Sequence, residues 1–549
     1  AATLANDRPR RRPRGSRHGR AETEMSSRPA TVPAALEEVP PQTTAGAQAS
    51  MAHSSLWAAV SQVAVLGIQG VAALAILLTF GKGADTDAVF AAYGVYGVLV
   101  VMCQTLRLTV VARVVESPSA WAAFDRFLGA GLSLLVIAGA LQIAFGGPIA
   151  RLLTGDLGPH AQSIARDTLA ILWIAVGGQL VAALGAAVLG VRGEFRYPGL
   201  SFMAGGVLNI AILLGLSGPI GILSVAAGVA AGSALSAAAM VGQLYREGYR
   251  LDPRRVLAGA RELRTSLMLL IASTATVMTQ ISFVVSTAFA AKLGVGAVTL
   301  YTTAFFGGAV VIALTASAAA LVLAAPVAKT WDRNPDGLLP HLQTIMRAGL
   351  MLIAPAVAVA ALVGDDLINL ALGSTFTPTD AHRAIGAFVA LSGLFVGILA
   401  MQLPLLAAYA TARYRAVALL AILATVVHVA ASAWAQHLGS IAWLAAAASL
   451  SNLTAMALVI GLVHRGGAPR ALAIVARETA VVALACAVSF GPAGLAAAAL
   501  GSGAWDLAAV VVGAVVFVLI LRGLLPQYAA VAHRMLGPVL PARMRPATA

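Results

Sequence analysis

The sequence has little charge. Only 11% of its 549 residues are Asp, Glu, Lys or Arg, against about 25% in a typical soluble domain. The two cysteines, Cys103 and Cys486, lie in apolar stretches and lack metal-ligand spacing, so no disulfide framework beyond that one pair is possible. No nucleotide-binding loop and no Ser/His/Asp arrangement is recognisable, and no polar stretch is long enough for a soluble catalytic domain. We therefore expect no enzyme, no cofactor and no bound metal.

Apolar residues are abundant instead. They make up 59% of the chain, and the mean hydropathy is +0.87. Apolar runs of about 20 residues recur, which is the length that crosses a hydrocarbon core about 30 Å thick. A β-barrel would show short alternating segments instead. The sequence therefore predicts an all-α polytopic membrane protein with fourteen transmembrane helices in two pseudo-symmetric lobes.

The fourteen expected spans divide into six before and eight after a charged stretch near the middle of the chain. They are 56–80, 88–111, 127–149, 168–189, 200–216, 220–243, 267–291, 298–325, 347–363, 384–407, 416–436, 441–463, 471–490 and 507–521.

The expected domains follow from these spans. Residues 1–50 form a basic, disordered cytoplasmic tail, because no apolar pattern in them would offset the entropy of ordering. Residues 51–244 form an N-lobe, and 267–464 form a C-lobe. Between the lobes, residues 245–266 form a cytoplasmic bridge rich in arginine. Residues 465–525 add two spans to the C-lobe, and 526–549 form a second cytoplasmic tail.

The distribution of basic residues tests this topology. With the N-terminus inside, only five of the 36 Lys and Arg residues fall on outside loops; they are Lys82, Arg151, Arg166, Lys292 and Arg383. Such a bias is typical of cytoplasmic loops. The net charge of +14 is therefore a topology signal, and we expect no nucleic-acid partner. The prediction is a multi-pass protein of a bacterial cytoplasmic membrane with both termini in the cytoplasm.

An internal repeat relates the two halves. Lys82 ends the first span before a turn of small residues, and Lys292, 210 residues later, ends the seventh span in the same way. A second pair of similar segments begins at Arg192 and Arg413, a shift of 221 residues. The members of each pair lie an even number of spans apart and so share one orientation. This describes a parallel repeat, an arrangement common among secondary transporters that rock about a central cavity.

Several stretches resemble the MurJ (MviN) lipid II flippases of the MOP exporter superfamily. Residues Gly81 to Ala92 match the family pattern G-x-G-x-x-T-D-A-x-F-x-A, in which the aspartate is Asp87. Further similar stretches follow in the same order; they are 192–198, Leu208-Asn209, Gln280-Ile281, 349–355, 370–373 and 376–381. The resemblance covers nearly everything outside the two tails.

The resemblance implies a flippase that carries an undecaprenyl-diphosphate-linked glycan from the inner to the outer leaflet. Helices one, two, seven and eight would line a cavity between the lobes. A polar headgroup is costly to move through hydrocarbon, so it would travel in a wet protein cavity while the lipid tail stays outside. The implied partners are the lipid-linked glycan, membrane lipids, and an ion gradient or membrane potential as the energy source.

The chain departs from the family in the expected cavity. Positions where the family carries arginine or a charged pair fall on Ala72-Ala73, near Val100-Val101 and on Ser286-Thr287. Three functions therefore stay open. The first is a flippase for a lipid II-like precursor. The second is a MOP-superfamily exporter of other cargo, either an O-antigen-type oligosaccharide lipid or small molecules in a MATE-like antiport. The third is a scaffold that recruits cell-wall synthesis proteins through its N-terminal tail.

Four charged residues are candidates for substrate binding. Asp87 either caps the second helix or acts in the cavity. Lys82 and Lys292 either face a phosphate at the outer mouth or snorkel from helix ends. Arg107, in the inner turn of span two, either grips the diphosphate or anchors that span.

The uncharged candidates lie at lipid depth; they are Gln62, Gln69, Gln280, Ser286 and Thr287. Such side chains either line a cavity or hydrogen-bond neighbouring helices. His428 stands in the middle of span eleven, where it either takes a proton or bonds to a neighbouring helix.

Overall fold

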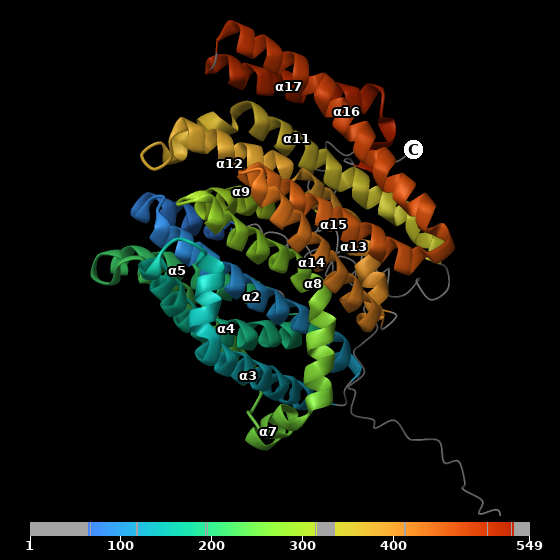
Figure 1. Ribbon diagram of the computed structural model, residues 1–549. Helices are drawn as coiled ribbons and strands as arrows, with labels where there is room; N and C mark the ends of the chain where they lie inside the picture. The colour runs from blue at the N-terminus through green and yellow to red at the C-terminus, as the bar shows by residue number, and fades with distance from the viewer. Residues whose placement is uncertain are drawn as a thin grey trace, which may run out of the picture. The chain divides into compact units, whose positions relative to one another are not determined.

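The fold is a bundle of helices. The computed structural model describes residues 64–65, 67–116, 119–192, 194, 196–312, 315, 335–410, 413–501, 503–528 and 530–531. Within these ranges every regular element is a helix, and no strand occurs (Figure 1). The predicted all-α class is confirmed.

Apolar helices occur at all fourteen expected spans. Ten stretches are long and apolar enough to cross a membrane, and one of them, Arg196–Arg246, contains two of the expected spans. Shorter apolar helices at Gly67–Phe80, Gln280–Leu293 and Ala297–Ile312 fall on spans one, seven and eight. The remaining parts of those spans lie outside the described residues or contain side chains that are not described. The chain is a polytopic helical membrane protein.

The first half continues from the helix Gly67–Phe80 through five long helices and a 3-10 turn. They are α2 (Ala84–Glu116), α3 (Ala120–Thr154), α4 (Pro159–Val191), α5 (Arg196–Ile220), η1 (Gly221–Leu223) and α6 (Ser224–Arg246). Local sequence sets their starts. The Ser119 side chain accepts a hydrogen bond from the amide of Ala122 and so caps α3. Pro159 opens α4 at a position where no amide donor is needed.

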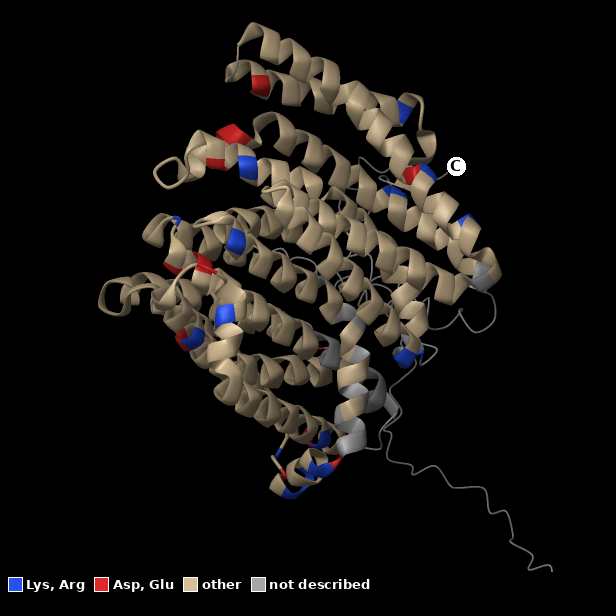
Figure 2. Cartoon of the chain, viewed as in Figure 1, with Lys and Arg blue, Asp and Glu red and all other residues tan. Residues whose placement is uncertain are grey.

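The expected bridge contains a short amphipathic helix, α7 (Pro253–Arg261). Asp252 caps it by accepting a hydrogen bond from the amide of Arg254. The helix packs on α3 through two glycines: a Cβ on Gly129 or on Gly259 would lie about 2 Å from a backbone oxygen of the other helix. Basic residues are gathered on and around α7 (Figure 2). The bridge is therefore seated on the first half of the chain.

The second half begins directly after α7. Its elements are α8 (Leu263–Ala290), η2 (Ala291–Leu293), α9 (Ala297–Ile312), η4 (Pro335–Leu338), α11 (Leu339–Leu372), α12 (Pro378–Ala390), α13 (Ser392–Ala410), α14 (Tyr414–His437), α15 (Ile441–His464), η5 (Arg465–Gly467), α16 (Ala468–Leu500) and α17 (Ala504–Gly523). One expected span differs in detail, because span ten is built from two helices, α12 and α13, that break at Leu391.

Two hydrophobic cores organise the described residues. The smaller core joins α2, α3, α4 and α6 within the first half. The larger core contains most of the second half, and it also takes in residues at one end of the first-half helices, among them Leu77, Phe90, Leu153 and Ile164. The two halves are therefore packed together at the end of the bundle that carries the turns after the first and seventh spans.

Candidate functional site

The repeated turns meet between the two halves. The first turn, at Gly81–Gly83, joins the helix Gly67–Phe80 to α2. The second runs from η2 through Gly294 and Gly296 into α9. Gly296 has a φ of +86°, and a Cβ there would lie 2.7 Å from the Lys82 side chain. Glycine thus permits both the backbone conformation and the close approach of the two turns.

Asp87 joins the halves. Its carboxylate is fully buried, and Oδ2 accepts a hydrogen bond of 2.6 Å from the amide of Gly296. Oδ1 accepts bonds from the amide and the hydroxyl of Thr299, at 2.8 and 2.5 Å. These amides open α9, where the first N–H groups of a helix lack partners and a negative charge is favoured. Asp87 of α2 therefore supplies the cap that glycine at position 296 lacks.

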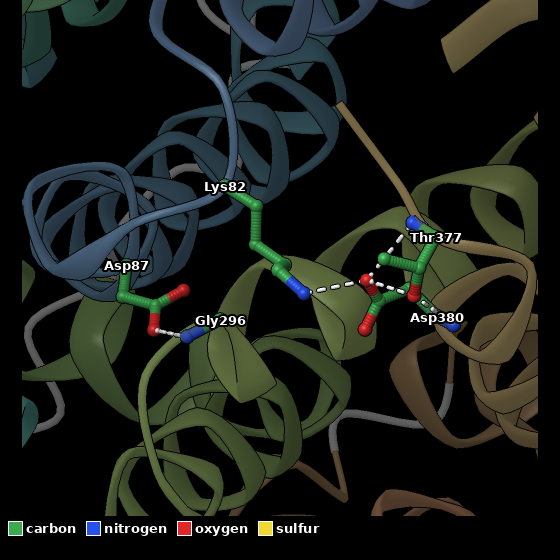
Figure 3. Close-up of polar contacts among 5 residues, drawn as sticks. All are labelled: Lys82, Asp87, Gly296, Thr377 and Asp380. Atoms are coloured by element: carbon green, nitrogen blue, oxygen red, sulfur yellow. Dashed lines mark hydrogen bonds and ion pairs between the residues drawn. The ribbon is translucent and has the colours of Figure 1, made fainter. Parts of the chain in front are cut away.

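Lys82 makes a second contact across the same junction. Its Nζ lies 2.5 Å from Oδ2 of Asp380, which is the third residue of α12 (Figure 3). Asp380 also forms a capping box with Thr377 at the start of that helix. We call the contacts of Asp87 and of Lys82 with the second half the latch.

An aromatic layer lies next to the latch, one turn further along α2. Phe90 and Tyr93 of α2 meet Phe306 of α9 with ring centroids 6.3 and 6.1 Å apart, both edge to face. Phe306 in turn stacks on Phe283 of α8 at 6.1 Å. Such pairs add to the free energy of apolar burial. The latch and the aromatic layer together close the junction between the halves.

The other predicted residues are distributed more widely. Lys292 is exposed and lies 5.3 Å from the centroid of the Phe289 ring. Gln280 is half-buried against α2 at Gly97. Thr287 donates to the carbonyl of Val284 in its own helix, and the Ser286 hydroxyl lies 3.1 Å from Nε2 of His428. Gln69 is exposed on the first described helix. Gln62 and the side chain of Arg107 lie outside the described residues.

Two residues of the latch escaped sequence reasoning. Asp380 lies in the family-like stretch 376–381, but neither Asp380 nor Thr299 was predicted as a site residue. The pattern Thr377-Pro-Thr-Asp380 is a recognisable capping box, and it would have placed a helix start there. No local pattern, however, indicates that Lys82 meets it.

A further buried polar cluster ties the C-terminal helices together. Glu478 of α16 is 2% exposed and accepts hydrogen bonds from Arg347 and Gln343 of α11. The hydroxyl of Tyr528, which follows α17, also donates to it. Burial, and then the hydrogen bond to Glu478, raise the pKa of the Tyr528 phenol above its usual value. The phenol therefore remains a donor at any physiological pH.

We expect the Lys82 contact to contribute little by itself. The lysine side chain is 26% exposed, and ion pairs open to water contribute about 0–1 kcal/mol. Closure is measured by a reporter cysteine, Phe90→Cys with Cys103→Ala and Cys486→Ala, and by the rate of its reaction with a membrane-impermeant maleimide. The reporter is present in every chain compared, so the loss of the Phe90 ring from the aromatic layer is common to all of them. Lys82→Gln should raise that reaction rate about fivefold or less. Lys292→Gln serves as the control and should leave the rate unchanged. A much larger effect of Lys82→Gln would show that this ion pair dominates the latch.

The fold and the latch define the class of this protein. It is a polytopic α-helical membrane protein whose two halves meet at the turns after its first and seventh spans. A family model described as lipid II flippase MurJ matches residues 112–515. The chain therefore belongs to the MurJ lipid II flippase family, a family of transporters active in peptidoglycan-related transport.

Solved structures share the fold. The MurJ lipid II flippase in an inward closed conformation has 14% sequence identity and a TM-score of 0.64, covering 89% of this chain and 99% of that one. An inward-facing MATE multidrug resistance transporter of the MOP superfamily has 17% identity and a TM-score of 0.61, covering 76% and 98%. A MOP-superfamily transporter from Pyrococcus furiosus has 15% identity and a TM-score of 0.56, covering 77% and 96%. No curated protein sequence matches.

Proposed function

We propose that this protein flips a polyprenyl-diphosphate-linked cell-envelope precursor, similar to lipid II, across the cytoplasmic membrane by alternating access. The main support for this proposal is the buried contact that Asp87 makes between the two halves. Asp87 lies in the stretch that resembles the family motif, and its three hydrogen bonds hold the start of α9 in the other half. A contact that joins two repeats at one end of a bundle is what an alternating-access transporter must break and remake.

The distribution of Lys and Arg supports an outer position for this latch. The conformation with the latch closed would then take up substrate from the inner leaflet. Parting of the latch and of the aromatic layer would open a path to the outer leaflet for the polar headgroup, while the polyprenyl tail stays in lipid. An ion gradient or the membrane potential would supply the energy. Cell-wall synthesis proteins would be partners through residues 1–50, and both termini would be cytoplasmic.

A second candidate is export of other cargo by the same fold. Ser286 and Thr287 stand where the family carries a charged element, and their hydroxyls hydrogen-bond His428 and the carbonyl of Val284. Neither residue is therefore a cationic grip for a diphosphate. MATE transporters share the fold, which favours a cargo without a diphosphate as the alternative.

Depletion of the protein in its own host distinguishes a flippase for a lipid-linked glycan from an exporter of other cargo. We expect lipid II, or a related lipid-linked glycan, to accumulate in the inner leaflet, and we expect the intact chain to reverse the accumulation when expressed again. Leaflet distribution is measured by the accessibility of the glycan to a reagent added outside the cell. A normal distribution of every lipid-linked glycan during depletion, together with normal growth, would contradict the proposal and favour export of other cargo.

A further inference from the structure

His428 is buried in the membrane-spanning part of the second half. It lies in α14, thirteen residues from one end of the apolar stretch Arg415–His437 and nine from the other. Its side chain has no exposed surface. Helix α14 packs on α8 and α15 at this level. An ionisable side chain at such depth is costly to keep unless it has a role.

The contacts of the His428 ring indicate which of its nitrogens carries the proton when the ring is neutral. Nε2 lies 2.9 Å from the backbone carbonyl of Ser282 in α8. A carbonyl oxygen only accepts hydrogen bonds, so Nε2 must carry the proton. The hydroxyls of Ser286 and Ser432 lie 3.1 and 3.4 Å from the same nitrogen. In the neutral ring the free lone pair is therefore on Nδ1.

Nδ1 is a buried acceptor with no hydrogen-bond partner in the described part of the chain. Buried polar atoms without partners are rare, and a site that can bind a proton accounts for this one. The geometry thus provides a vacant proton acceptor at membrane depth.

The charged surroundings of the ring are simple. Among the described residues of α8, α13 and α15, no charged side chain interacts with His428. The phenol of Tyr301 in α9 lies near Ser286, but its buried hydroxyl makes no hydrogen bond within the described part of the chain. Tyr301 follows Thr299, which holds Asp87, by two residues. Ser286, which contacts His428, is therefore close to α9, the helix that the latch caps.

We propose that His428 binds a proton during the transport cycle and that this proton favours opening of the latch. The inference rests on the proposed transport function and assigns its coupling ion. A neutral ring fits the buried site of the closed state. A protonated ring adds a charge at membrane depth, where no carboxylate of the described helices interacts with it, so it favours a conformation in which the ring reaches water. Low pH on the accessible side therefore shifts the population away from the closed latch.

The test measures opening of the latch by cysteine accessibility and needs no substrate. The full chain carrying the Phe90→Cys reporter, with Cys103→Ala and Cys486→Ala, is reconstituted in liposomes, and maleimide labelling is measured as a function of pH. The labelling rate, corrected for the known pH dependence of the reagent with a free thiol, should rise about tenfold between about pH 8 and pH 5. His428→Gln and His428→Asn should flatten this response. His382→Gln serves as the control, since His382 is exposed and pairs with Asp365, and it should keep the response.

An unchanged response in both His428 variants, or no response in the reporter chain with His428 intact, would overturn the inference. A second measurement separates it from the proposed function. Transport of a polyprenyl-diphosphate-linked glycan is followed in the same liposomes with and without an imposed pH gradient. If transport occurs at the same rate with and without the gradient, proton coupling is contradicted and the proposed flippase function stands. If the latch opens at low pH but no lipid-linked glycan is transported, the proton site stands and the proposed flippase function is contradicted.

Discussion

Replacing Asp87 with alanine should open the latch and abolish transport. The substitution removes the acceptor of three hydrogen bonds at the start of α9 and leaves those donors buried in the closed state. Hydrogen bonds to a charged group contribute about 1.5–3 kcal/mol each, and water replaces part of that in the open state. A net loss of about 3 kcal/mol would change the ratio of closed to open molecules roughly a hundredfold.

The Phe90→Cys reporter measures this shift as a faster maleimide reaction, and leaflet distribution of the lipid-linked glycan measures the loss of transport. Asp85→Ala is the matched control. Asp85 lies in the same first turn of α2, but its side chain is 48% exposed and interacts only weakly with exposed His160. It should leave both readouts unchanged. If Asp87→Ala behaved like Asp85→Ala, the latch would not hold the closed state.

Replacing Glu478 with alanine should cost the most stability. The side chain is almost fully buried and is the common acceptor for Arg347, Gln343 and Tyr528. Its removal leaves a guanidinium only 18% exposed without its partner, and breaking one member of a buried pair costs about 3–5 kcal/mol. Thermal unfolding of the purified chain in detergent measures the change, and we expect the lower end of that range.

Two variants sharpen this prediction. Asp365→Ala removes a 42% exposed carboxylate paired with an 80% exposed histidine, and it should change stability by less than about 0.5 kcal/mol. Glu478→Leu combined with Arg347→Met removes both charges, so it should recover much of the loss. A single Glu478→Ala as harmless as Asp365→Ala would show that the cluster does not stabilise the fold.

The number and order of the helices could be predicted from the sequence, because apolar runs and the uneven distribution of Lys and Arg are properties of continuous segments of the chain. The turns at Lys82 and Lys292 were predicted for the same reason. The partner of Asp87 was not: a cap on its own helix was one reading, and the carboxylate caps a helix 210 residues away instead. Glu478 was missed although a single carboxylate in span thirteen is a signal for a functional or structural site.

The reach of Lys82 to Asp380, and of Ser286 to His428, depends on how helices distant in sequence pack. No spacing within one helix contains that information. From the sequence, Ser286 and His428 were predicted only as separate polar groups at lipid depth. Only the packing of α8 against α14 shows that they form one cluster.

The Asp87 contact runs in one direction only: the first half supplies the carboxylate, and the second half supplies the donors. A shift of 210 residues places Ala297 at the position of Asp87 and Thr86 at that of Gly296, so the mirror-image bond from the second copy to the first cannot form. Two identical subunits around a two-fold axis would make such a contact twice, and each subunit would have to serve as both donor and acceptor. Two halves within one chain are free of that constraint. One half carries the carboxylate and the other presents the helix start, so each can change without altering its counterpart.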